Sequence, residues 1–200
     1  MVLRQLPLER IHWLEIALMV ARQLKDSRME ALHLGNIGLT HAVLGNTKQA
    51  IELNEQALEI SREIKDRWEE AKFLGNLATA YKNLGDIRRS KELNVQALPI
   101  NREIRDRRGE ANNLDHIGGA YNKLGDARHA IGFSEQALVI NREIGYLRGE
   151  AYNLGNLAGF YKNIGDISRA IEFSEQAYKR FAAPEAIAVT DPRLPGSAPS

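Results

Sequence analysis

The chain has 200 residues, of which 27 are basic and 26 acidic, so bulk charge gives no attraction to nucleic acid or membranes. It contains no cysteine, which excludes disulfides, thiolate metal sites and cysteine nucleophiles. The apolar stretch of residues 11–21 is interrupted by His12 and Glu15, and is too short and too polar to span a bilayer. We therefore expect a soluble, cytoplasmic protein that binds neither nucleic acid nor a membrane.

The first predicted element is a single helix within residues 1–27. Its apolar and charged residues match residues that recur 40 positions later. The clearest matches are Ile11 with Ile51, Ala17 with Ala57, and Leu18 with Leu58. Because these positions belong to the second helix of each later unit, residues 1–27 are predicted to be a half repeat that contains this helix only.

Four full repeats are predicted to follow, at residues 28–67, 68–107, 108–147 and 148–181. Residues of the same type recur every 40 positions. The columns are Leu34, Leu74, Leu114 and Leu154; Gly45, Gly85, Gly125 and Gly165; Ala57, Ala97, Ala137 and Ala177; and Glu30, Glu70, Glu110 and Glu150. Each glutamate stands in the first turn of a predicted helix, where a carboxylate suits the positive helix end.

Within each repeat the apolar spacing predicts a hairpin of two helices. In the second repeat, steps of three and four residues join Ala71, Leu74, Leu77, Ala78, Tyr81 and Leu84. Gly85 can end this helix in the left-handed conformation, and Asp86 can cap the next one. Small residues at Gly38, Ala78, Gly118 and Ala158 predict close contact between the two helices. Since one hairpin cannot bury both of its apolar sides, neighbouring hairpins are expected to stack.

Two segments depart from this pattern. Pro99 lies inside a predicted helix, where it removes the backbone hydrogen bond to Val95, so we predict a kink. Residues 182–200 are rich in proline and small side chains and are predicted to be disordered.

The repeat resembles the tetratricopeptide repeat, most completely in the fourth unit. The positions that carry the resemblance are Leu154, Leu157, Ala158, Tyr161, Gly165, Asp166, Ala170 and Ala177. The usual period of that family is about 34 residues, and the longer period here is similar to that of kinesin light chains, Leu-Gly-Asn-rich adaptors and bacterial signalling ATPases. The resemblance implies an all-α, right-handed superhelical solenoid of antiparallel helix hairpins. It also implies a non-catalytic protein-binding scaffold whose concave groove is lined by the first helix of each hairpin.

The predicted peptide-binding residues form the exposed stripe of these first helices. They are Asn36, Lys72, Asn76, Thr79, Lys82, Asn83, Asn112, Asp115, His116, Asn122, Lys123, Tyr152, Asn156, Lys162 and Asn163. Amides can both donate to and accept from a peptide backbone, and the stripe carries four lysines against one acid. We therefore expect an extended protein or peptide ligand that bears carboxylates. A simpler interpretation also stays open, that any exposed helix face is polar and lysine is a good helix former.

No residue pattern predicts a catalytic, metal or cofactor site. The five histidines form no pair with i, i+4 spacing, and no glycine-rich segment has the form of a nucleotide-binding loop. Two further hypotheses concern the whole chain. It could be the sensor or regulatory segment of a larger signalling ATPase or transcriptional regulator. Tyr178 and Phe181 in the last predicted helix also favour end-to-end self-association, because solenoids generally need polar caps.

Overall fold

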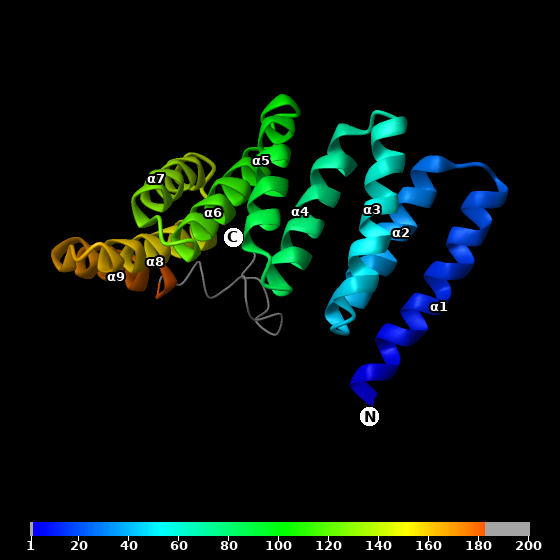
Figure 1. Ribbon diagram of the computed structural model, residues 1–200, viewed down its shortest axis with the longest axis horizontal. Helices are drawn as coiled ribbons and strands as arrows, with labels where there is room; N and C mark the ends of the chain where they lie inside the picture. The colour runs from blue at the N-terminus through cyan, green and yellow to red at the C-terminus, as the bar shows by residue number, and fades with distance from the viewer. Residues whose placement is uncertain (1, 183–200) are drawn as a thin grey trace, which may run out of the picture. The chain divides into compact units, whose positions relative to one another are not determined.

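The computed structural model describes residues 2–182, with side chains from Pro7 onward. Within these residues it contains nine α-helices and no strand, which confirms the all-α prediction (Figure 1). The helices are α1 Val2–Gln23, α2 Ser27–Val43, α3 Thr47–Glu63, α4 Arg67–Asn83, α5 Ile87–Glu103, α6 Arg107–Lys123, α7 Ala127–Glu143, α8 Leu147–Asn163 and α9 Ile167–Phe181. From residue 183 on, the tail that was predicted to be disordered lies outside the described residues.

The helices form two compact units, α1–α5 within Met1–Asp106 and α6–α9 within Arg107–Ser200. In each unit every helix packs against the next along the chain, and short turns reverse the direction between them (Figure 1). The first helices of neighbouring repeats also touch, α2 with α4 and α6 with α8. Each unit is therefore a stack of antiparallel hairpins. The handedness of a superhelix through both units stays a prediction.

The turns within the hairpins have the predicted chemistry. The four turn glycines have φ between +82° and +88° at Gly45, Gly85, Gly125 and Gly165. In this left-handed region a Cβ atom would be strained, so glycine suits the position. Asp86 Oδ1 then accepts a hydrogen bond from the backbone N–H of Arg89 at 2.9 Å, which caps α5.

The helix bounds differ little from those expected. The first helices begin at Ser27, Arg67, Arg107 and Leu147, one residue before the predicted repeat boundaries. Helix α5 continues through Pro99, whose ring lies on the exposed side of the helix. The kink at Pro99 stays a prediction.

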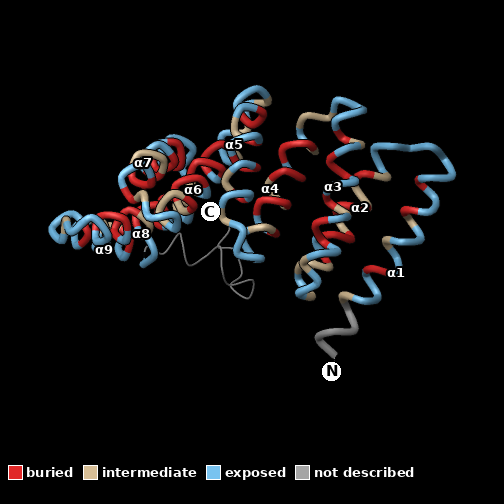
Figure 2. Tube along the Cα trace, viewed as in Figure 1, coloured by how far each residue is buried: buried red, intermediate tan, exposed pale blue. Residues whose placement is uncertain are grey.

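The core is built from the repeating apolar columns, which face neighbouring helices (Figure 2). The leucine column is almost completely buried, at 1% or less exposure for Leu34, Leu74, Leu114 and Leu154. A Cβ added to Gly38 would lie 2.5 Å from Nδ2 of Asn54, which confirms close contact between α2 and α3. Leu84 was wrongly assigned to the apolar stripe: it is 51% exposed, because it is the residue that ends α4.

Buried ion pairs join consecutive helices at the glutamate column. The Glu150 side chain is only 4% exposed, and its carboxylate contacts Nε of Arg142 at 2.9 Å and Nε of Arg180 at 3.1 Å. Glu70 is bound in a similar way by Nε of Arg62 at 3.0 Å. The sequence interpretation of these glutamates as complements to the helix end was therefore incomplete, because Glu70 also joins α4 to α3 and Glu150 joins α8 to α7.

The contact between neighbouring first helices has an apolar form in one unit and a polar form in the other. In the α1–α5 unit, a Cβ on Gly35 would lie 2.2 Å from Cε1 of the fully buried Phe73. Two repeats later, Asp115 and Asn153 occupy the same two positions, and Asn153 Nδ2 donates to Asp115 Oδ1 at 2.7 Å. The same two repeat positions thus meet in both units, while the chemistry of the contact changes.

Candidate functional site

The predicted binding residues of the α1–α5 unit lie on α2 and α4. They are Asn36, Lys72, Asn76, Thr79, Lys82 and Asn83. Several already have partners within the unit. Asn76 Nδ2 donates to Asn54 Oδ1 at 3.1 Å, and Lys72 Nζ lies 2.9 Å from a carboxylate oxygen of Glu69. Lys82 is exposed and forms no ion pair within residues 2–182.

The predicted residues of the α6–α9 unit lie on α6 and α8. They are Asn112, Asp115, His116, Asn122, Lys123, Tyr152, Asn156, Lys162 and Asn163. Asp115 Oδ1 accepts from Nδ2 of Asn153 at 2.7 Å and from Nδ2 of Asn156 at 2.8 Å. The acid of this face is therefore bound by amides from the neighbouring helix.

A hydrogen bond between two side-chain amides joins the ends of α6 and α8. Asn163 Nδ2 donates to Asn122 Oδ1 at 2.8 Å. Each asparagine is followed or preceded by an exposed lysine, Lys123 and Lys162, and neither lysine has an ion-pair partner in the described part of the chain. This hydrogen bond thus fixes two side-chain amides, each of which is next in sequence to one of these lysines.

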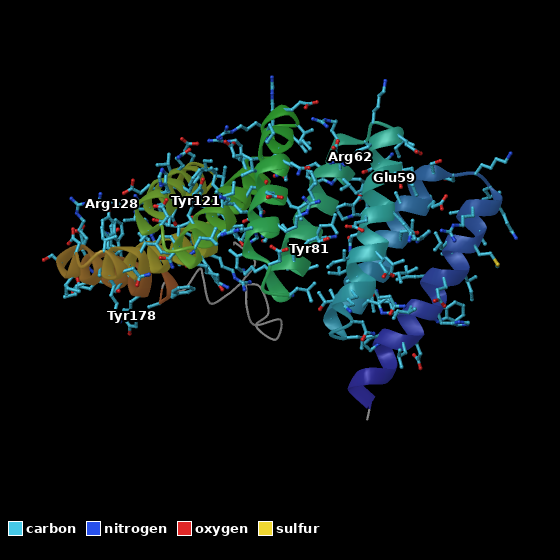
Figure 3. The ribbon with its side chains drawn as sticks, viewed as in Figure 1. Glu59, Arg62, Tyr81, Tyr121, Arg128 and Tyr178 are labelled. Carbon is cyan, nitrogen blue, oxygen red and sulfur yellow. The ribbon has the colours of Figure 1, made fainter. Side chains whose placement is uncertain are left out.

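A cleft of about 610 Å³ opens beside this amide pair. It is lined by Asn122, Leu124, Gly125, Asp126, Ala127, Arg128, Asn163 and Ile164. Sequence reasoning missed Arg128, which lies in the first turn of α7 (Figure 3). The basic residues Lys48 and Arg88 at the same repeat position were a signal that could have identified it.

The acid in the wall of this cleft is already engaged. Asp126 Oδ1 accepts from the backbone N–H of His129 at 3.2 Å, and Oδ2 lies 2.6 Å from His129 Nδ1. The backbone hydrogen bond from His129 lowers the pKa of Asp126, and the His129 side chain adds to the effect. The donors that remain in the cleft are amide and guanidinium groups, which suit carboxylate oxygens.

A different cleft lies on the second-helix side of the α1–α5 unit. It is formed by α3 and α5, with residues of α4 at its base. It has a volume of about 510 Å³ and is lined by Glu55, Leu58, Glu59, Arg62, Glu63, Leu77, Tyr81, Arg89, Leu93 and Gln96. Glu59, Arg62 and Tyr81 are labelled in Figure 3. Sequence reasoning did not identify this cleft.

Tyr81 connects two walls of this second cleft. Its hydroxyl donates to Glu55 Oε1 at 3.3 Å, and the guanidinium of Arg89 lies 6.0 Å from its ring centre. Burial raises the pKa of Tyr81, and the negative charge of Glu55 raises it further. The hydroxyl therefore stays protonated as a donor at neutral pH.

Helix α9 has an exposed apolar stripe. Its residues are Ile167, Ile171, Tyr178 and Phe181, which are 49–75% exposed. The equivalents of Ile171 and Tyr178 in α7 are Ile131 and Leu138, which are only 9% and 5% exposed in the unit where α8 packs on α7. The stripe on α9 thus corresponds to the surface that a following helix covers elsewhere in the array.

Residues 2–182 contain no cluster of three or more His, Asp or Glu side chains that could hold a metal ion. The same residues include no helix that is long and apolar enough to cross a membrane.

Models of the tetratricopeptide repeat match residues 27–108 and 151–183. A search of curated proteins found no match. Among solved structures, BtubC (BKLC) from P. vanneervenii has a TM-score of 0.78 at 22% identity, covering 94% of this chain and 75% of that one. Aspartyl phosphate phosphatase F from Bacillus subtilis has a TM-score of 0.78 at 16% identity, with 87% and 46% covered.

A third structure is the signal transduction ATPase (STAND) protein PH0952 from Pyrococcus horikoshii, which has a tetratricopeptide repeat sensor. It matches with a TM-score of 0.72 at 21% identity, over 78% of this chain and 24% of that chain. These likenesses concern the fold, and with the repeat models they confirm the resemblance inferred from the sequence. Arrays of this kind are generally scaffolds for protein partners rather than catalysts. The chain belongs to the tetratricopeptide-repeat family.

Proposed function

We propose that the chain is a protein-binding scaffold whose first-helix faces hold an extended, carboxylate-bearing segment of a partner protein. The observation that carries the proposal is the charge of these faces. Lys82, Lys123 and Lys162 are exposed without an ion-pair partner among the described residues, whereas Asp115 is hydrogen-bonded within its unit. The faces therefore have unneutralised positive charge in a chain that is almost neutral overall.

The cleft at the ends of α6 and α8 supports a particular position for a ligand carboxylate. Asn122 and Asn163 share one hydrogen bond, which leaves the amide nitrogen of Asn122 and one amide proton of Asn163 for a ligand. Arg128 lies in the wall of the cleft. Lys123 follows Asn122 in the sequence, and Lys162 precedes Asn163. A carboxylate bound here would gain charge-assisted hydrogen bonds at preorganised donors.

The proposal is tested with a fluorescent peptide of alternating aspartate and leucine that has a free C-terminal carboxylate. Binding to the full chain is measured by fluorescence anisotropy, and an amidated peptide with asparagine in place of aspartate serves as the ligand control. The double variant Lys123→Glu with Lys162→Glu should weaken binding at least about tenfold, which corresponds to about 1.4 kcal/mol. Lys179→Glu, an exposed lysine on α9 of the same unit that lies outside the cleft, is the protein control.

Unchanged affinity in the double variant would contradict the proposal. It would instead favour the simpler interpretation, that the lysines serve only to keep the helix face polar. The first-helix residues of the α1–α5 unit are tested in the same assay with Asn76→Ala and Lys82→Glu.

A second function is favoured by the likeness to the repeat sensor of the PH0952 ATPase. On this view the array is the sensor or regulatory segment of a larger signalling protein, and the bound segment is its signal. Gene context would test this alternative, since it requires an ATPase or a transcriptional regulator in the same reading frame.

A further inference from the structure

The cleft between α3 and α5 has the composition of a second binding site, with a charge preference opposite to that of the first-helix faces. We propose that it binds a basic amphipathic segment of a partner protein, with an apolar side chain on its floor and arginine or lysine side chains at its rim. This inference concerns a different surface and does not depend on the function proposed above.

The floor of the cleft is apolar and belongs to the packed core. Leu58, Leu77 and Leu93 line it and belong to the buried core, at 7%, 2% and 3% exposure. The volume of about 510 Å³ lies within the usual range of ligand pockets, about 300–1,000 Å³. An apolar side chain placed against this floor would be removed from water without any rearrangement of the core.

The rim of the cleft carries carboxylates that the array itself does not use. Glu59 and Glu63 are exposed and have no ion-pair partner in the described part of the chain. The arginines of the cleft already have carboxylate partners, because Arg62 contacts Glu70 at 3.0 Å and Arg89 contacts Glu92 at 3.0 Å. The net potential at the rim is therefore negative, which complements a cationic segment.

Comparison with other repeats explains why Glu63 is unpaired. Arg67 contacts Glu103 at 2.7 Å, and Arg107 contacts Glu143 in the same way; in both pairs the glutamate stands 36 positions after the arginine. The residue 36 positions before Glu63 is Ser27, which has no positive charge. The glutamate keeps its place in the repeat but lacks the arginine that neutralises it elsewhere.

The equivalent surface of the α6–α9 unit lacks these features. Val139 stands two repeats after Glu59, and Phe173 stands two repeats after Leu93. The Phe173 ring is stacked on Tyr161 with ring centres 5.4 Å apart. The acidic rim beside an apolar floor is therefore particular to the α3–α5 cleft and is not required by the repeat fold.

The test uses an acetylated, amidated pentapeptide of alternating arginine and leucine, titrated into the ¹⁵N-labelled full chain. Chemical-shift changes should map to α3 and α5 around the cleft, and binding should weaken with added salt. The double variant Glu59→Val with Glu63→Gln should raise the Kd at least tenfold. Because neither carboxylate has a partner in the unit, the variant should remain folded, which its unchanged spectrum outside the cleft would verify.

The control is Glu52→Gln, which removes one carboxylate from an exposed position of α3 outside the cleft, and its Kd should stay within twofold of the parent chain. The proposal would be overturned if the peptide caused no shifts at the cleft, or if the double variant bound as well as the Glu52→Gln control. Equal binding of spermidine, which has the charge but no apolar side chain, would also overturn it, because the floor would then have no role.

Discussion

Replacing Gly35 with alanine should destabilise the α1–α5 unit, although alanine is the better helix former. The added Cβ would lie 2.2 Å from Cε1 of Phe73, well inside van der Waals contact. The Phe73 ring is fully buried, so it can move away only by disturbing the core around it.

The expected magnitude follows from two opposing terms. Alanine should stabilise the helix by about 0.8–1.0 kcal/mol relative to glycine. Overpacking in a close-packed core costs roughly 1–3 kcal/mol. Because the contact with Phe73 is so short, we expect the cost to fall in the upper part of its range. The net loss in the free energy of unfolding should then be about 1–2 kcal/mol.

The same substitution at Gly75 is the control. Gly75 holds the same position in the next repeat, and a Cβ there meets no atom within 4 Å. Gly75→Ala should therefore stabilise the unit by up to about 1 kcal/mol. The assay is urea unfolding followed by tryptophan fluorescence, since the two tryptophans, Trp13 and Trp68, both lie in the α1–α5 unit.

A second substitution identifies the contact that is responsible. Phe73→Leu removes the ring edge that meets the new Cβ, so it should cost less in the Gly35→Ala background than in the parent chain. The difference is a coupling energy, expected at about 0.5–3 kcal/mol for residues in contact. The reasoning is refuted if Gly35→Ala stabilises the unit as much as Gly75→Ala does.

Three further predictions concern the α6–α9 unit. Asp115→Gly should destabilise it by roughly 1–3 kcal/mol, because the buried Asn153 amide loses its acceptor. Hydrogen exchange of the α6 and α8 amides should then become faster, and unchanged exchange would contradict this prediction. The pKa of Asp126 is lowered by the backbone N–H of His129, so its cap stabilises the unit fully above the unfolded value of 3.8 and the stabilisation is lost as the pH falls through the lower folded value. A carboxyl ¹³C titration that gave a pKa at or above 3.8 would contradict this. The apolar stripe of α9 should cause self-association that Tyr178→Glu weakens, whereas sedimentation of the parent chain as a strict monomer at high concentration would count against it.

Much of the fold could be predicted because it depends on residues close together in the chain. The left-handed turn at Gly85 and the cap by Asp86 follow from local backbone chemistry, and the burial of Leu74 follows from helical spacing. Leu84 was misplaced for a related reason, since periodicity continues past the residue at which the helix ends.

The clefts and the contacts between first helices could not be predicted in this way. Whether Asp115 faces solvent or accepts from Asn153 depends on how closely two first helices approach, which no local pattern specifies. The unpaired charge of Glu63 depends on Ser27, 36 residues away. That relation becomes visible only when the Arg67–Glu103 pair shows which positions meet.

The most direct test of the proposed function is to locate a bound acidic peptide on the ¹⁵N-labelled full chain by chemical-shift mapping. The account predicts that the peptide of aspartate and leucine perturbs first-helix residues, foremost Asn122, Lys123, Lys162 and Asn163, and that amidation with asparagine substitution abolishes the effect. Shifts confined to the second helices, with these four residues unperturbed, would contradict it.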